Sequence, residues 1–152
     1  MIDQCGVCAA HTESADGHCL AWQSDLWVLR HHPLPAPLVG WFLLDARRHV
    51  ASAADLNASE EKQFAQVLGA SMRAIRTAMG VPRVYVVMFG EGAHHLHAHL
   101  IARDPSNTAT KSWSVADLYR LVESGKRPPA DGREIATVVA RLREFMRTTT
   151  LR

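Results

Sequence analysis

The apolar and polar positions along this chain predict four strands. Mainly apolar runs at 26–30 and 40–45 indicate two strands, and a proline-rich connection, HHPLPAP, separates them. Proline has a restricted φ and no amide hydrogen, so this connection is predicted to be a loop. A buried strand is predicted over 84–89. Residues 95–102 alternate histidines with apolar residues, which is the period of a strand with two unlike faces.

A long helix is predicted to begin after Asn57. Asparagine is a favourable N-cap, and Glu60 stands three residues later, in the capping-box position. Apolar residues follow at three- and four-residue spacing and form one stripe. Gly80 and then Pro82 are predicted to end the helix.

The C-terminal third of the chain is predicted to be helical. A long helix is expected after Asp131, with Glu134 in the box position, and a short helix after Ser112 or Ser114. Residues 1–19 show no periodicity and are predicted to be a loop. The order strand, strand, helix, strand, strand, helix is typical of an α+β fold with a mostly antiparallel sheet.

The composition is that of one globular domain over residues 1–152, with 47% hydrophobic and 21% charged residues. The formal net charge is only +2, so no nucleic-acid partner is predicted. No apolar stretch approaches the roughly 20 residues that span a membrane, and MIDQCGVC is unlike a signal peptide. A cytoplasmic location is expected, where three cysteines suit a metal or chemistry better than disulfides.

Three histidines share one face of the last predicted strand. His95, His97 and His99 would stand about 6.6 Å apart in a row, with apolar residues facing the other way. A solvated strand face is one interpretation, and a three-histidine metal site is another, although the spacing is wide for one ion. The third interpretation is catalysis at phosphorus, in which a neutral imidazole attacks and its neighbours orient it and bind phosphate oxygens.

Cys5 and Cys8 have the two-residue spacing that suits one zinc ion. The sequence leaves two sets of partner ligands open, besides a reduced pair without metal. One set is local and consists of His11 or His18 with Cys19. The other set reaches across the fold to His49 and His95. Four protein ligands would leave no open coordination position, so such a metal would be structural.

The segment HLHAHLI, residues 95–101, matches the His-φ-His-φ-His-φ-φ signature, where φ is apolar, and the chain therefore resembles the histidine-triad superfamily. The likeness extends to LWVLRHHPLPAPLVGWFLLDARRHV and to DLNASEEKQFAQVLGASMRAI, and covers about residues 5–103. It implies an α+β histidine-triad-like fold with an antiparallel sheet of about five strands and one long helix. The residues from about 112 to 152 would form a C-terminal helical extension.

The resemblance also implies an activity, namely a nucleotide hydrolase or nucleotidyl transferase that cleaves a phosphate anhydride, ester or phosphoramidate. Dinucleoside polyphosphates and phosphoramidates are the substrate candidates. His97 would be the nucleophile, and the backbone around His99 would hold His97 in the productive tautomer. Members are usually homodimers, which is expected here too.

The resemblance favours the long-range zinc site, with Cys5, Cys8, His49 and His95 as ligands. It also places candidate substrate contacts around the triad strand. Arg103 follows the strand and would contact phosphate. Glu91 and Gly92 lie in the turn before the strand, where Glu91 would position a leaving group or be a solvated turn residue.

Several positions depart from the pattern of the superfamily. Trp41 follows Gly40 where many relatives have a histidine that joins the triad network, so the network is expected to be one imidazole short unless His31 or His32 substitutes. No acidic residue precedes the proline-rich connection to bind ribose hydroxyls. Two other functions therefore stay open: a zinc-stabilised module that binds nucleotides or a protein without turnover, and a metal-delivery protein.

Overall fold

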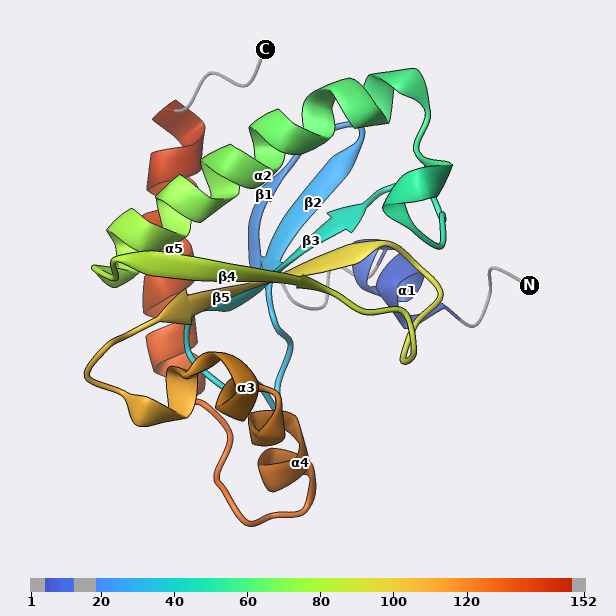
Figure 1. Cartoon of the computed structure of the whole chain (residues 1–152). Coiled ribbons are helices and arrows are strands. Elements are labelled where there is room, and N and C mark those ends of the chain that lie inside the picture. The colour runs from blue at the N-terminus through green and yellow to red at the C-terminus, as the bar shows by residue number, and fades with distance from the viewer. Residues whose placement is uncertain (1–4, 13–18, 149–152) are drawn as a thin grey trace.

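The structure, a computed structural model, describes residues 5–12 and 19–148. Its centre is a five-stranded antiparallel sheet with the strand order β1-β2-β3-β5-β4 (Figure 1). The strands are β1 Leu20–Gln23, β2 Trp27–His31, β3 Trp41–Ala46, β4 Arg83–Met88 and β5 His97–Arg103. The α-helices are α1 Gly6–Thr12, α2 Ala58–Met79, α3 Ser112–Val115, α4 Asp117–Glu123 and α5 Gly132–Thr148. Short 3-10 turns are η2 Ala53–Asp55 and η3 Thr108–Thr110. The predicted α+β class with a mostly antiparallel sheet is confirmed.

Helix α2 begins and ends at the predicted residues. The Asn57 side chain accepts hydrogen bonds from the amides of Ser59 and Glu60, and the Glu60 carboxylate accepts one from the Asn57 amide at 2.8 Å. Gly80 ends the helix with φ 64°, in the left-handed region that glycine adopts without strain. These caps satisfy backbone groups that the ends of a helix would otherwise leave unpaired.

Parts of the N-terminal prediction were wrong. Residues 6–12 form the helix α1 where a loop was expected, and β1 adds a strand that pairs with β2. These elements have only 7 and 4 residues, too few to show a period. The predicted short helix is two, α3 and α4, and β5 begins at His97 rather than at residue 95.

The two faces of the sheet have different coverings. Phe42 and Leu44 of β3 pair with Leu100 and Ala98 of β5, and all four belong to the main core under α2 and α5. Side chains alternate along a strand, so the intervening residues face the opposite side. We call that side, which carries Asp45, His97 and His99, the histidine face.

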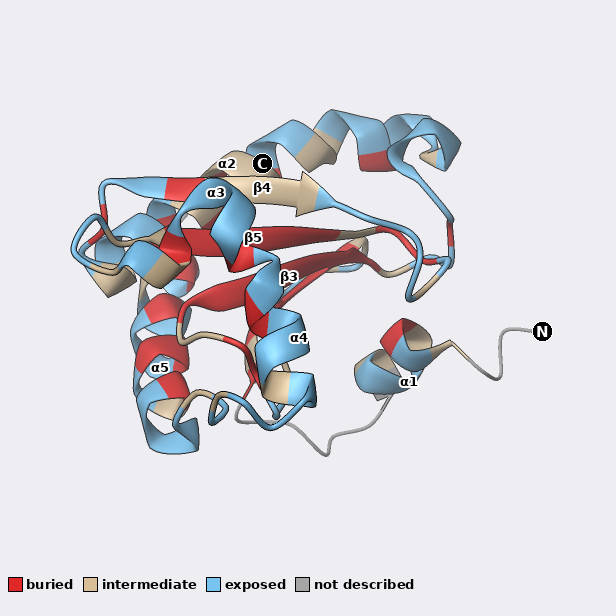
Figure 2. Ribbon diagram, turned by 60° about the horizontal axis from the view of Figure 1, so that its bottom comes forward, coloured by how far each residue is buried: buried red, intermediate tan, exposed pale blue. Residues whose placement is uncertain are grey.

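The C-terminal helices cover part of the histidine face. Val115 of α3 and Leu118 of α4 pack on Trp41 of β3 and Ile101 of β5. Figure 2 shows α3 and α4 in front of these strands. The segment after β5 therefore builds one wall beside the histidines.

In the part of the chain that the structure describes, every helix is too short or too polar to cross a membrane.

Candidate active site and metal centre

The ring of His97 is held in one tautomer by the backbone. Its Nδ1 lies 2.6 Å from the carbonyl oxygen of His95. A carbonyl only accepts hydrogen bonds, so Nδ1 carries the hydrogen and Nε2 keeps its lone pair. The expectation that the backbone around His99 would set this tautomer was wrong, because the backbone of the first histidine in the triad does so.

His99 is held in the opposite sense by Trp41. The indole Nε1–H donates to Nδ1 of His99 at 3.0 Å, and both side chains are buried. Because an indole nitrogen can only donate, Nδ1 of His99 is the acceptor and its Nε2 carries the hydrogen. Burial is the main cause that lowers the pKa of His99 from 6.5 to about 4, so the ring is neutral at pH 7. The network has no imidazole at residue 41, as predicted, but the indole of Trp41 supplies a hydrogen bond to His99 from that position.

His31 and His32 do not take over that bond. His31 is buried on the core face, where its Nε2 accepts from the amide of Gly40 at 3.0 Å. Burial lowers the pKa of His31 to about 4. His32 lies beside Trp41, with ring centroids 6.2 Å apart, and its Nδ1 donates to the carbonyl of Pro33. Its Nε2 is left as an acceptor when the ring is neutral, and burial lowers the pKa of His32.

Helix α4 adds Tyr119 to this aromatic group. Its ring centroid is 4.9 Å from that of Trp41, 5.1 Å from that of His32 and 6.3 Å from that of His99. Burial raises the pKa of Tyr119 to about 12, so its hydroxyl stays protonated. On another side, Phe89 lies 6.1 Å from His99 and is exposed. The sequence analysis did not predict a role for either residue.

A buried ion pair lies on the histidine face next to His97. Nε of Arg30 is 2.6 Å from Oδ2 of Asp45, and Asp45 pairs across the strands with His97. Nε2 of His11, on α1, lies 3.2 Å from the same oxygen. Despite burial, the hydrogen bonds from His11 and Arg30 and the charge of Arg30 lower the pKa of Asp45, which is therefore ionised at pH 7. Charged residues inside buried apolar runs are a signal that the sequence analysis missed.

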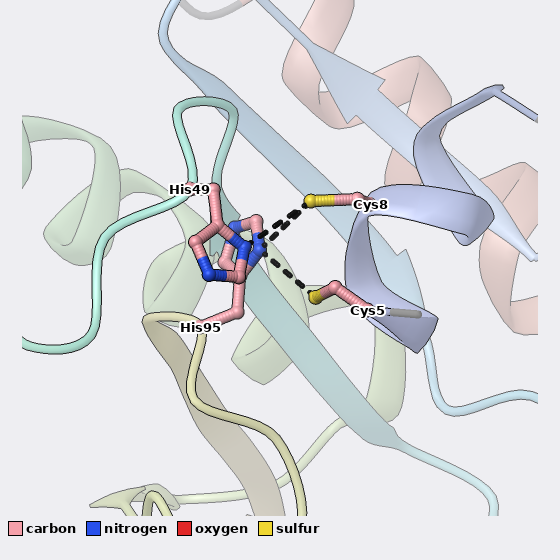
Figure 3. A group of neighbouring side chains, drawn as sticks. All are labelled: Cys5, Cys8, His49 and His95. Carbon is pink, nitrogen blue, oxygen red and sulfur yellow. Dashed lines mark hydrogen bonds between the residues drawn. The ribbon is translucent and has the colours of Figure 1, made fainter. Parts of the chain in front are cut away.

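Four candidate metal ligands come together at the end of the histidine face. Donor atoms of Cys5, Cys8, His49 and His95 all lie within 4.8 Å of one another (Figure 3). Sγ of Cys8 is 3.4 Å from Nδ1 of both histidines, and Sγ of Cys5 is 3.5 Å from Nδ1 of His95. Bonds of about 2.3 Å to sulfur and 2.0–2.1 Å to nitrogen put such atoms about 3.5 Å apart around a tetrahedral zinc ion. The spacing therefore fits zinc.

The hydrogen bonding of His95 fits the same donor set. Its Nε2–H donates to the carbonyl oxygen of Ala46 at 2.7 Å, so the lone pair of Nδ1 points toward both sulfurs. Histidines that bind a metal through one nitrogen commonly donate from the other in this way. Of the local alternatives, His11 bonds Asp45, buried Cys19 is outside the cluster, and His18 lies outside the described residues.

Comparisons with known proteins were made on sequence and on structure. No protein-family model and no curated protein sequence matches the chain. Among solved structures, a zinc-bound histidine triad family protein from Mycobacterium smegmatis superposes with a TM-score of 0.70 and 15% identity, over 98% of this chain and 100% of that one. A histidine triad protein from Bradyrhizobium japonicum gives 0.62 and 20%, over 87% and 94% of the two chains. The chain has the histidine-triad fold.

A third solved structure with the histidine-triad fold is a diadenosine triphosphate hydrolase from Plasmodium falciparum in complex with Cyclomarin A. It superposes with a TM-score of 0.61 and 11% identity, over 90% of this chain and 81% of that one. The likeness predicted from HLHAHLI is thus confirmed at the level of the fold.

Within this histidine-triad fold, the candidate substrate contacts lie away from His97. Arg103 is six residues further along β5, about 20 Å in an extended strand. Its Nη1 donates to the carbonyl of Asp104 and to Thr110, which ties down the turn after the strand. The expected phosphate contact of Arg103 near His97 does not fit this geometry. Glu91 and Gly92 are exposed in the preceding turn, and the Glu91 carboxylate accepts from the Gly90 amide, as in a solvated turn.

A cleft of about 760 Å³ is not lined by any of the triad histidines. Its lining comes from the start of α5, the end of α2 and the turn after β5, and none of the predicted site residues lines it. The histidines that suggested a catalytic site in the sequence therefore lie on the histidine face and do not line this cleft.

Proposed function

We propose that this protein is a histidine-triad nucleotide hydrolase or nucleotidyl transferase with His97 as its nucleophile. The observation that carries the proposal is the hydrogen bond from Nδ1 of His97 to the carbonyl of His95, at 2.6 Å. In the neutral ring it leaves the lone pair on Nε2, and His97 is only half-buried, as an attacking imidazole requires. The diadenosine triphosphate hydrolase of similar fold supports nucleoside phosphates as the substrate class.

The reaction proceeds by two displacements at the α-phosphorus. In the first, Nε2 of His97 forms a P–N bond while the bond from phosphorus to the leaving oxygen or nitrogen breaks and the leaving group keeps the electron pair. A phosphate leaving group needs no proton, whereas an amine takes one from solvent. In the second, water attacks the phosphorus, the P–N bond breaks, and the water proton goes to solvent. A phosphate acceptor in place of water makes the reaction a transfer.

His99 would assist by hydrogen bonding rather than by giving up a proton. Its neutral ring, with Trp41 bonded to Nδ1, presents Nε2–H to a phosphoryl oxygen. A pKa of about 4 means that almost none of this ring is imidazolium at pH 7. The stabilisation is therefore that of a fixed donor aimed at developing negative charge.

We further propose that Cys5, Cys8, His49 and His95 hold a structural zinc ion. Zinc bound there would cross-link three segments: the start of α1, the loop after β3 that carries His49, and the residues just before β5 that carry His95. The last of these lies next to the nucleophile. Four protein ligands leave no position for substrate or water, so the ion would stabilise the site without taking part in the displacement. The zinc-bound neighbour of similar fold supports this choice of metal.

We propose a homodimer as well. β4 is an edge strand of the sheet, and Met88 and Phe89 at its end are exposed apolar residues. An unpaired strand edge with apolar residues is suited to pairing with a second copy.

The covalent step is tested by rapid quenching with a nucleotide labelled at the α-phosphate. An acid-labile, base-stable adduct should form on the wild-type protein and be absent in His97→Ala. Zinc content should be equal in the two proteins, which shows that the variant keeps its metal centre. No adduct and no turnover with dinucleoside polyphosphates and phosphoramidates would refute the enzyme and favour a binding module.

A further inference from the structure

Arg30 is a buried cation on the histidine face. β2 is buried along its whole length, and the Arg30 side chain is only 10% exposed. In the sheet register Arg30 pairs with Leu43, and Leu43 pairs with His99, so the three residues form one row across the strands. The backbone of Arg30 thus lies two strands away from the triad. Its long side chain can reach the triad when it is directed along that row.

Asp45 directs the guanidinium toward the nucleophile. The bond from Arg30 Nε to Asp45 Oδ2, at 2.6 Å, takes the guanidinium from its own row to the row that Asp45 shares with His97. His11 bonds the same oxygen from α1, the helix that also carries Cys8 and directly follows Cys5. Oδ2 therefore receives both contacts while Oδ1 has no partner, and the register places the ion pair next to His97.

The ion pair leaves the end of the arginine side chain unsatisfied. Only Nε donates to Asp45, and no residue in the described part of the chain accepts a hydrogen bond from either Nη group. An arginine has five donors in a planar fork. The Nη groups are not among the fully buried polar atoms that lack a partner, whereas Oδ1 of Asp45 is, so the Nη groups are open to solvent or to a ligand. A purely structural pair would use the fork in a bidentate contact with the carboxylate, which this one does not. The remaining donors are therefore available to an anionic acceptor that binds at this face.

We infer that Arg30 is a phosphate-binding residue, whose Nη groups donate to non-bridging oxygens of the phosphoryl group that His97 attacks. Asp45 and His11 are positioning residues that act through Arg30. The inference rests on the proposed function for the place of the phosphoryl group. Arg30 supplies the cation that Arg103 cannot, and with His99 in the same row it adds a second donor on the histidine face.

The contact is tested by binding, with no turnover required. In a His97→Ala background, affinities for AMP and for adenosine are measured by calorimetry, and their ratio reports the contribution of the phosphate. Arg30→Gln should reduce this ratio by about 10- to 100-fold, the value of charge-assisted hydrogen bonds. Arg83→Gln, which removes an exposed arginine at the far end of β4, should leave the ratio unchanged.

A second variant guards against misfolding and against the carboxylate left unpaired. Arg30→Met combined with Asp45→Leu removes both charges and keeps apolar volume, and it should lose the preference for AMP to the same extent. Equal ratios with and without Arg30, or no binding of AMP to the His97→Ala protein, would overturn the inference. The proposed covalent mechanism fails separately, if wild-type protein forms no adduct while the AMP preference still depends on Arg30.

Discussion

Replacing Trp41 with phenylalanine removes one indole N–H and with it the hydrogen bond to His99. The bond is 3.0 Å long, and Trp41 and His99 are 3% and 7% exposed, so water has little access to replace it. Leaving Nδ1 of His99 without a donor costs about 1–3 kcal/mol. The substitution also replaces a buried indole with a smaller ring. The lost packing lowers the free energy of unfolding in any variant of this kind.

Trp27 provides the matched control. It is also fully buried and stacks on Phe64 with ring centroids 5.1 Å apart, but its Nε1 has no hydrogen-bond partner among the described residues. Trp27→Phe therefore removes a similar ring and N–H group but breaks no hydrogen bond. The difference between the two variants therefore reports the bond to His99 together with the relief of the unpartnered Nε1–H that Trp27→Phe removes.

Urea unfolding followed by circular dichroism measures this difference. Trp41→Phe should lower the free energy of unfolding by about 1–3 kcal/mol more than Trp27→Phe does. At about 2–4 °C per kcal/mol for a chain of this size, melting temperatures should differ in the same order. Nitrogen-15 spectra should show that His99 loses its single tautomer only in Trp41→Phe. Equal losses of stability, with an unchanged His99 tautomer, would refute the reasoning.

Three other predictions concern the metal centre, the ion pair and pH. Cys5→Ser should abolish a zinc content of about one ion per chain and lower the melting temperature, whereas Cys19→Ala should keep the metal. Elemental analysis of untagged protein checks this, and zinc retained in Cys5→Ser would contradict it. Asp45→Asn should cost about 3–5 kcal/mol by leaving Arg30 buried and unpaired, while Arg30→Met with Asp45→Leu should restore most of the stability, measured by urea unfolding. Similar stability of Asp45→Asn and wild type would count against the pair. Because the pKa of His99 is lowered from 6.5 to about 4, the unfolded chain binds more protons between these pH values, and the free energy of unfolding should fall as pH drops through them. His99→Gln should flatten part of that slope in unfolding experiments from about pH 7 to pH 4, and a slope identical to that of wild type would exclude this cause.

Much of the fold followed from local patterns. The capping box at Asn57 and the glycine at residue 80 set the bounds of α2, because caps act on neighbouring backbone groups within one turn. The alternation from His95 to His99 indicated a strand with unlike faces, because side-chain direction in a strand depends only on position along it. Elements as short as α1 and β1 were missed, because tertiary contacts and not a local period define them.

The sequence by itself determined the longer elements, the α+β class and the chemical types available, namely alternating histidines, a cysteine pair and their resemblance to the histidine triad. The tertiary structure alone decided the partners. Trp41 meets His99 from 58 residues away, and His95 meets the two cysteines from 90 and 87 residues away. Which nitrogen of His97 is free, and which acid holds Arg30, depend on two hydrogen bonds, each 2.6 Å long. Such contacts arise only when the strands pair and the core closes, and neither distance along the chain nor residue type specifies them.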